Sequence, residues 1–302
     1  MKLRLILLAS FAASLYSVNA WAAACCGGGS ASPSTISNDD FAQLSASFSY
    51  TNVVVDNVDS DGYWRRFDNH QTIKTYKLQG ASLISDRWQV GFVLPVLTRD
   101  RLGDSHTALG DIAGTVGYEI LPDWDYHPFR PKGIVFLQVT LPSGISRYES
   151  SIGALDSTGN GFLAIGVGTL LTKTFNDFDG LILLEAHRSF SKDASTSIGE
   201  ARIEPGFGGN FGVGAGYNLG DFRLGGVITW TVEDPVKLVG TDGTRFDGAV
   251  ERYATGSITL SYMESEHYSG TLSYTDQTWF GNPTNTSLGR GIAIQIQRRW
   301  AR

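Results

Sequence analysis

Residues 86–100 read DRWQVGFVLPVLTRD, in which apolar side chains alternate with polar, charged or small ones. Such alternation is typical of a β-strand whose two faces meet different surroundings. One face carries Trp88, Val90, Phe92, Leu94 and Val96. Arg87 and Gln89 begin the other face. A soluble sandwich would bury the apolar face in its core, whereas an outer-membrane barrel would turn it to lipid and the mixed face to a lumen.

The lengths of the connections between such segments decide between the two folds. Alternating segments follow one another from residue 43 to the end of the chain. Long connections cover 53–70, 98–108, 142–160, 191–204, 234–251 and 277–290, and short ones cover 83–87, 176–180, 218–221 and 263–267. Long and short connections alternate, as extracellular loops and periplasmic turns do in outer-membrane barrels. The connection 121–132 is long although it falls on the short side, so it is either a periplasmic excursion or a misplaced boundary.

The sequence therefore predicts an all-β fold, a transmembrane up-and-down antiparallel β-barrel of about twelve strands over residues 43–302. In lipid every backbone N–H and C=O needs an internal partner, so the sheet must close without a free edge. The predicted location is the bacterial outer membrane, with its lipid as a partner. Aromatic side chains near the strand ends suit the two interfacial girdles, namely Tyr50, Trp88, Tyr118, Tyr217, Trp230, Tyr262, Tyr274 and Trp300.

The face opposite the lipid-facing one is predicted to line the lumen. Its polar members are Arg87, Gln89, Asp111, Glu119, Glu185, His187, Arg223, Gln295, Gln297 and Arg299. Polar groups collect on this face because a charge turned to the bilayer midplane costs roughly 2–4 kcal/mol. These groups either select a solute at a constriction or satisfy one another as a buried network, and both interpretations stay open.

The N-terminus has the order of a secretory signal peptide. Lys2 and Arg4 precede a short apolar stretch and small-residue cleavage sites, which predicts a signal over 1–22 with cleavage as late as 24. Residues 25–42 are predicted to form a flexible leader. Cys25 stands where a bacterial lipoprotein carries its lipidated cysteine, although Ala22 replaces the usual leucine. A metal or redox role for Cys25 and Cys26 and an inert linker are the other possibilities, and the linker is favoured.

The C-terminal stretch 289–302, GRGIAIQIQRRWAR, has alternating isoleucines and a near-terminal aromatic residue. This is the general form of the strand that the barrel-assembly machinery recognises, so that machinery is a predicted partner. Nucleic acid is excluded as a partner, because the chain has 30 acidic residues against 24 basic ones and no basic patch.

Two weaker patterns concern metal binding and catalysis. Asn57, Asp59, Asp61 and Asp68 nearly trace the spacing of a calcium loop, with Asn57 and Asp68 replacing the usual first aspartate and last glutamate. A solvated acidic loop is the simpler interpretation. His187 lies two residues from Ser189, but both fall on one strand with lumen parity, and no nucleophile elbow occurs elsewhere. The chain is therefore not predicted to be an enzyme, and no cofactor is expected.

Three stretches resemble a known family. LGDIAGTVGYEIL at 109–121, FLQVTLPSGIS at 136–146 and DSTGNGFLAIGVG at 156–168 are similar to the Gly-Asp, Leu-Pro-Thr-Gly and Gly-x-Gly succession of the outer-membrane family named after the MetA pathway of phenol degradation. That family is similar in turn to the aromatic and fatty-acid channel barrels. Ser143 stands where threonine is commoner. The resemblance implies an outer-membrane barrel involved in transport and carries over no catalytic residues.

The leading functional prediction is a channel or transporter that lets a small solute, of the apolar or aromatic kind, cross the outer membrane by passive diffusion. The alternative is a structural or adhesive surface barrel whose lumen is closed and whose extracellular loops bind partners.

Overall fold

The computed structural model describes residues 33–37, 40–67, 70–124, 127–196, 199–265 and 267–302. Its strands are β1 (Asp40–Val58), β2 (Trp64–Arg65), β3 (Thr72–Leu83), β4 (Trp88–Arg101), β5 (Asp104–Leu109), β6 (Ile112–Leu121), β7 (Lys132–Leu141), β8 (Ala164–Phe175), β9 (Phe178–Ser189), β10 (Lys192–Thr196), β11 (Gly199–Glu204), β12 (Phe207–Leu219), β13 (Phe222–Glu233), β14 (Lys237–Gly240), β15 (Arg245–Asp247), β16 (Glu251–Met263), β17 (Tyr268–Asp276) and β18 (Thr286–Ala301). No helix among these residues is long and apolar enough to cross a membrane.

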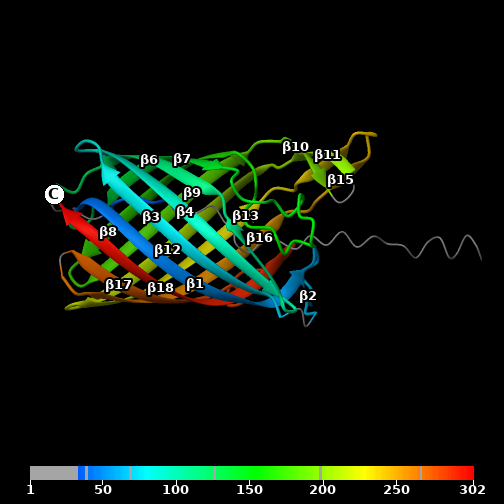
Figure 1. Ribbon diagram of the computed structural model, residues 1–302. Coiled ribbons are helices and arrows are strands. Elements are labelled where there is room, and N and C mark those ends of the chain that lie inside the picture. Colours follow the sequence, from blue (N-terminus) through cyan, green and yellow to red (C-terminus); the bar gives the residue numbers. More distant parts are fainter. Residues whose placement is uncertain (1–32, 38–39, 68–69, 125–126, 197–198, 266) are drawn as a thin grey trace, which may run out of the picture.

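Twelve of these strands form one closed antiparallel barrel (Figure 1). Their order is β1, β3, β4, β6, β7, β8, β9, β12, β13, β16, β17 and β18. The barrel closes where β18 pairs with β1, from Asp40 opposite Ala301 to Val58 opposite Thr286. Closure gives every barrel strand two neighbours, which is what a sheet in lipid requires. The prediction of a twelve-stranded up-and-down barrel is confirmed.

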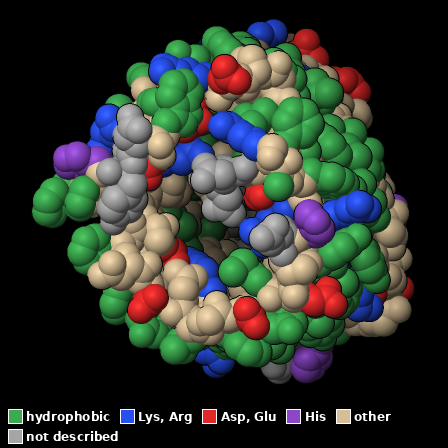
Figure 2. All heavy atoms as spheres, turned by 90° about the vertical axis from the view of Figure 1, so that its left-hand side faces the viewer, with side chains coloured by type: hydrophobic (Ala, Val, Ile, Leu, Met, Phe, Trp, Pro, Cys, Tyr) green, Lys and Arg blue, Asp and Glu red, His purple; other side chains and the backbone are tan. Residues whose placement is uncertain are grey.

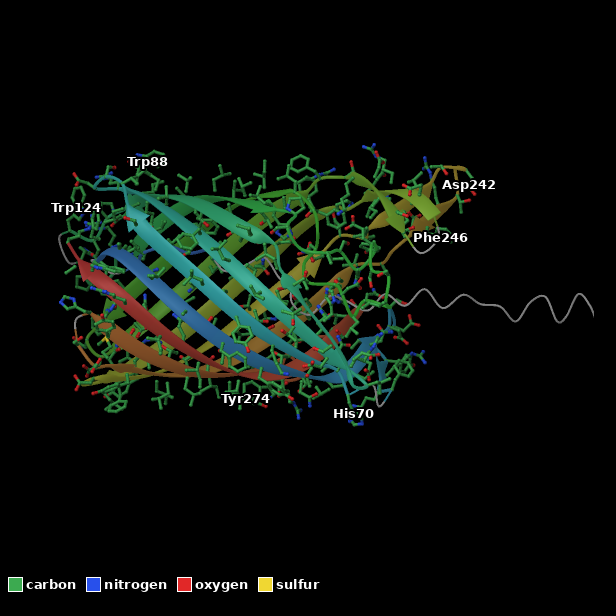
Figure 3. All side chains as sticks on the ribbon, in the orientation of Figure 1. His70, Trp88, Trp124, Asp242, Phe246 and Tyr274 are labelled. Atoms are coloured by element: carbon green, nitrogen blue, oxygen red, sulfur yellow. The ribbon has the colours of Figure 1, made fainter. Side chains whose placement is uncertain are left out.

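The two faces of each strand separate as the alternation predicts. On β4, Trp88, Val90, Phe92 and Val96 are exposed on the outside, while Gln89, Val93 and Leu97 are buried on the inside. The outer face is ringed by aromatic cross-strand pairs such as Phe48 with Tyr76 and Trp88 with Tyr118. Figure 3 shows side chains projecting outward along the barrel, Tyr274 among them. Large apolar side chains exposed on the outside of a closed barrel place the strands in a membrane.

Short and long connections lie at opposite ends of the barrel. The short turns and the C-terminus lie at the left end in Figure 1, and the long loops with β2, β10, β11 and β15 lie at the right end. The connection 122–131 between β6 and β7 belongs to the turn end, where Lys173 contacts Asp123 at 3.3 Å and Arg87 lies over the Trp124 ring. This connection is therefore a true excursion, and each predicted boundary lies within one residue of the observed strand end.

Two features of the loop end were not predicted. Strands β10, β11, β14 and β15 form a separate four-stranded sheet beyond the barrel. Beneath it, Phe162 of the loop 142–163 packs with Ala194 and Ile203. The sheet and the loop thus share a small core of their own at the loop end.

The N-terminal segment 33–37 lies against the inner face of the barrel. The Ile36 amide donates to Gln89 Oε1 at 2.6 Å, and the Ser34 hydroxyl donates to the Gly80 carbonyl at 2.9 Å. Ile36 packs on Ala81 and Leu83, which also face inward. The end of the predicted flexible leader is therefore ordered, because the barrel offers it hydrogen-bond partners and an apolar patch. Strand β1 begins at Asp40, three residues earlier than predicted.

Candidate channel lumen

One side of the lumen, formed by β4, β6 and β7, is sealed by the chain itself. The inward side chains Val93, Leu97, Ala113 and Ile134 are each about 1% exposed. The segment 33–37 covers the half of this side that is nearer the turn end. The loop 142–163 covers the half nearer the loop end, where Thr158 Oγ1 donates to the Leu109 carbonyl at 2.7 Å. Solute cannot pass along this side while both segments stay in place.

The three stretches that carry the family resemblance meet around Asp111 at the top of the sealed side. The Asp111 carboxylate accepts hydrogen bonds from the amides of Gly144 and Gly161, at 2.9 and 3.0 Å. The Ser143 hydroxyl donates to the Gly110 carbonyl at 2.7 Å. Glycine is required where the loop backbone lies directly on the carboxylate, so the motif residues hold the loop 142–163 inside the barrel.

The opposite side of the lumen, formed by β16, β17, β18 and β1, remains accessible. Its uncharged, half-buried inward side chains include Ser47, Ser49, Thr51, Thr255, Ser257, Thr259, Ser261, Ser269, Thr271, Ser273, Thr275, Ala293, Gln295 and Gln297. We call this set the hydroxyl wall. Its members are small and uncharged, and some bond each other, as Ser261 Oγ and Thr271 Oγ1 do at 2.9 Å. Between Glu251 at the loop end and Arg299 at the turn end, this side of the lumen is thus lined by neutral donors and acceptors.

Most charged side chains on the inner face are paired. The Arg223 guanidinium donates to Asp179 across β12, with Nε 2.7 Å from Oδ2. Lys132 and Glu119 lie 3.7 Å apart on neighbouring strands. The first pair links β13 to β9 across β12, and the second links neighbouring β6 and β7. Among the predicted lumen residues, Glu119 and Arg223 therefore stabilise the wall.

His187 is the centre of a polar network on the inner face of β9, β12 and β13. Its Nδ1 lies 2.9 Å from Glu185 Oε1, and its Nε2 lies 3.1 Å from Glu233 Oε1. Asn210 donates to Glu185 Oε2 at 2.7 Å, and Thr231 donates to Asn210 at 2.8 Å. Both ring nitrogens face carboxylates, so neither is free to act as a base toward Ser189.

Glycine on β12 makes room for these charged side chains. Gly208, Gly212, Gly214 and Gly216 all point inward. A Cβ on Gly208 would overlap Glu233 and His187, and a Cβ on Gly216 would overlap the Arg223 guanidinium. Large side chains from β9 and β13 can therefore lie flat across β12 and meet each other.

The remaining predicted residues lie at several levels of the lumen. Gln89 holds the segment 33–37, and Gln297 donates to Gln43 Oε1 at 2.9 Å. Arg299 lies at the turn end, where Nη2 donates to the Ser265 carbonyl at 3.4 Å. Arg87 precedes β4 and stacks on Trp124 instead of entering the barrel, with 4.9 Å between the guanidinium carbon and the ring centroid.

Several charged groups on the inner face were missed by the sequence analysis. Lys77, Arg99, Lys132 and Asp179 all have inward parity in the structure. For Lys77 the signal was present, because Thr75 and Gln79 alternate with outward Tyr76 and Leu78. For Lys132 this sequence signal was absent. Strand β7 also carries apolar Ile134 and Phe136 on its inner face, so its sequence is apolar on both faces and shows no alternation.

The loop that resembles a calcium site is occupied by other bonds. Asp59 accepts from the amides of Asp61 and Tyr63 and pairs with Arg65 at 3.0 Å. The Tyr63 amide bond is the largest cause of a lowered pKa at Asp59. Asp68, the signal peptide and Cys25 lie outside the described residues. Within those residues, no group of three or more His, Cys, Asp or Glu side chains could hold a metal ion.

Comparisons with known proteins agree with this fold. No protein-family model matches the chain, and no curated protein matches its sequence. The COG4313 outer membrane channel from Pseudomonas putida F1 superposes with a TM-score of 0.70 at 13% identity, over 89% of this chain and 100% of that one. A mutant of the monoaromatic hydrocarbon channel TodX superposes with a TM-score of 0.50 at 9% identity, over 90% of this chain and 93% of that one.

The barrel, its apolar belt and these likenesses define the class of protein. The chain is an outer-membrane β-barrel with the fold of channel proteins, as the family resemblance implied. Viewed from the turn end, the barrel is hollowed at its centre, with charged side chains around the mouth (Figure 2).

Proposed function

We propose that the protein is an outer-membrane channel through which small uncharged solutes diffuse passively. The hydroxyl wall carries this proposal, because it lines the accessible lumen with neutral donors and acceptors. A solute that moves along it exchanges hydrogen bonds to water for hydrogen bonds to serine and threonine, so its desolvation costs little. A charged solute would lose hydration along that wall, whose side chains are uncharged.

The same wall restricts the solute class. Apolar inward residues such as Val93 and Phe136 are buried by the rest of the chain, so a bare hydrocarbon finds no apolar path along the accessible side. The favoured solutes are small molecules that carry hydroxyl or amide groups, aromatic rings included. The adhesive alternative is less supported, since a closed barrel has no use for an accessible wall of hydroxyl groups.

Swelling of liposomes that contain the refolded protein tests this proposal. Arabinose is expected to enter several-fold faster than gluconate or lysine, which are similar in size but charged. The substitution Ser257→Trp should fill the passage and abolish arabinose entry, because Ser257 faces the lumen. Ile258→Trp is the matched control, since Ile258 is the next residue on β16 and faces lipid.

Two results would count against the channel. Folded protein that gives no more swelling than empty liposomes rules out passive diffusion in this conformation. Equal entry of charged and uncharged solutes leaves a channel but removes the role of the hydroxyl wall. Folding is checked in each sample by the shift in gel mobility on heating.

A further inference from the structure

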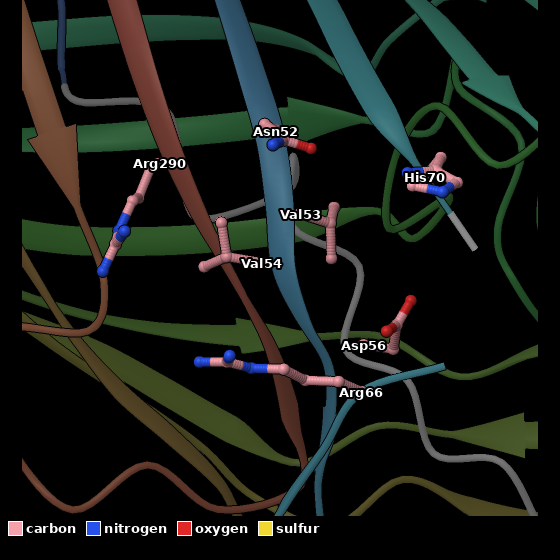
Figure 4. A pocket seen from close by; sticks show the side chains of 7 residues that line it. All are labelled: Asn52, Val53, Val54, Asp56, Arg66, His70 and Arg290. Atoms are coloured by element: carbon pink, nitrogen blue, oxygen red, sulfur yellow. The ribbon is translucent and has the colours of Figure 1, made fainter. Parts of the chain in front are cut away.

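A recess of about 280 Å³ lies on the outside of the barrel at its loop end (Figure 4). It is lined by Asn52, Val53, Val54, Asp56, Arg66, His70 and Arg290. Asn52 of β1 and Arg290 of β18 are register partners, and both are exposed on the outward face of their strands. The recess therefore opens toward the membrane and is separate from the channel lumen.

The recess lies directly above the apolar belt. The next outward pair toward the turn end is Tyr50 with Ile292, and both side chains are exposed. Tyr274 lies beside Ile292 in the same row. Tyrosine at the edge of an apolar belt marks the boundary between acyl chains and headgroups. The groups one row above it therefore lie at the level of the lipid headgroups of the outer leaflet.

Two arginine side chains line the recess. Arg66 and Arg290 lie on one side of β1 in Figure 4, whereas His70 and the carboxylate Asp56 lie on the other. Asp56 already accepts the Phe67 amide at 2.7 Å. Arg66 forms no ion pair with a carboxylate of the described residues. In Figure 4 the side chains of Arg66 and Arg290 extend to the same side of β1. The recess thus presents two guanidinium groups on one side of β1.

Arg290 is held in place for binding. Its Nε donates to Asp276 Oδ2 at 2.7 Å, and the Asp276 side chain is only 1% exposed. Its Nη2 donates to Thr278 Oγ1 at 3.1 Å. These bonds use two of the five N–H groups of the guanidinium and leave the others for a ligand. A fixed guanidinium loses little conformational entropy when it binds.

We propose that this recess binds a phosphate group on the headgroup of a lipid in the outer leaflet. Two guanidinium groups offer paired donors that match the oxygen atoms of phosphate. Asn52, the register partner of Arg290, adds an amide donor. The volume admits a phosphate and the atoms that carry it, since one water molecule occupies only about 30 Å³. The position at headgroup level selects a membrane lipid over a soluble anion.

Binding of phosphorylated lipid A to the full-length protein in detergent micelles, measured by native mass spectrometry, tests the proposal. Arg66→Gln and Arg290→Gln are each expected to weaken binding about tenfold, which is the loss of one charge-assisted contact. Lipid A from which the phosphates have been removed should bind the wild type as weakly as these variants do. Arg66→Gln keeps the test valid if Arg290→Gln fails to fold, because Arg66 makes no ion pair with a described carboxylate.

Arg188→Gln is the matched control. Arg188 also points outward near the loop end, but on β9, six strands from β1 around the barrel, where it lies over the Phe207 ring. This variant should bind phosphorylated lipid A like the wild type. Equal losses in Arg188→Gln and Arg66→Gln would mean a general attraction of lipid to surface charge and would overturn the site. Displacement of the lipid by inorganic phosphate at equal concentration would assign the recess to a free anion instead.

Discussion

Gly91 of β4 and Ser34 of the N-terminal segment touch so closely that a Cβ on Gly91 would overlap the Ser34 carbonyl oxygen. The backbone of the segment therefore packs directly against β4 at Gly91, where no side chain intervenes. Gln89, one inward position away, holds the same segment through Ile36 with two hydrogen bonds of 2.6 and 3.4 Å. The segment 33–37 therefore has a specific binding position on the inner face of the barrel wall.

The substitution Gly91→Ala should expel this segment. The methyl group would collide with backbone atoms of the segment that cannot rotate away, so the segment must leave the barrel wall. The free energy of unfolding should fall by about 1–3 kcal/mol. We expect higher and noisier conductance in planar bilayers and a lower unfolding midpoint in urea. Gly114→Ala is the control, because Gly114 faces outward and a Cβ there meets nothing within 4 Å. Identical conductance for both variants would show that the segment does not narrow the lumen.

Release of the loop 142–163 is the second expected effect of a single substitution. Asp111→Ala removes the acceptor of the Gly144 and Gly161 amides and leaves both donors without their partner. Bonds to a charged acceptor contribute about 1.5–3 kcal/mol each, so the loop should detach from the barrel. Limited proteolysis should then cleave within 142–163 in the variant. Asp104→Ala, on the exposed strand β5, should leave the loop as resistant as in the wild type.

The fold could be predicted from the sequence because a strand has a side-chain period of two. Trp88, Val90 and Phe92 could only share one face, and the loop lengths showed that this face meets lipid. The binding position of the segment 33–37 could not be predicted in this way. Its partners Gly80 and Gln89 lie about fifty residues further along the chain, and no local pattern links them.

The candidate site was only partly predictable. Charged residues such as Glu185 and Arg223 were assigned to the lumen from parity, and both point inward. Parity alone could not show that these residues are paired. Glu185 pairs with His187 on the same strand, and Arg223 pairs with Asp179 from a distant part of the chain. The hydroxyl wall was missed because serine and threonine are common on both faces of strands and give no hydropathy signal.

His187 is expected to be essential for the stability of the barrel wall. His187→Gln leaves Glu185 and Glu233 close together without the group between them, and breaking a buried charged network costs about 3 kcal/mol or more. The urea midpoint of the refolded protein should fall. Adding Glu233→Gln to this variant should restore part of the loss by removing one of the two carboxylates. No recovery in the double variant would mean that His187 acts by packing rather than by charge.

The loop 142–163 should open at acid pH through Asp156. Burial acts to raise the pKa of Asp156, but hydrogen bonds from Ser150 and Ser151 outweigh it and lower the pKa below its ordinary value. Because the pKa of Asp156 is lower in the folded loop than in the unfolded chain, the ionised carboxylate stabilises the loop at any pH above the unfolded pKa of about 4. This stabilisation is lost as the pH falls through the folded pKa. Cleavage of the loop by pepsin should therefore increase as pH falls below about 4.

Asp156→Asn separates this effect from general acid unfolding. The variant has no carboxylate to protonate, so its loop should be cleaved at a rate that changes little with pH and is fast throughout. Asp242→Asn serves as the control, because Asp242 also has a lowered pKa, caused first by the Thr244 hydroxyl, but lies in the exposed turn between β14 and β15. That variant should keep the pH dependence of the wild type. If Asp156→Asn shows the same pH dependence of loop cleavage as the wild type, the titration of Asp156 does not control the loop and another group does.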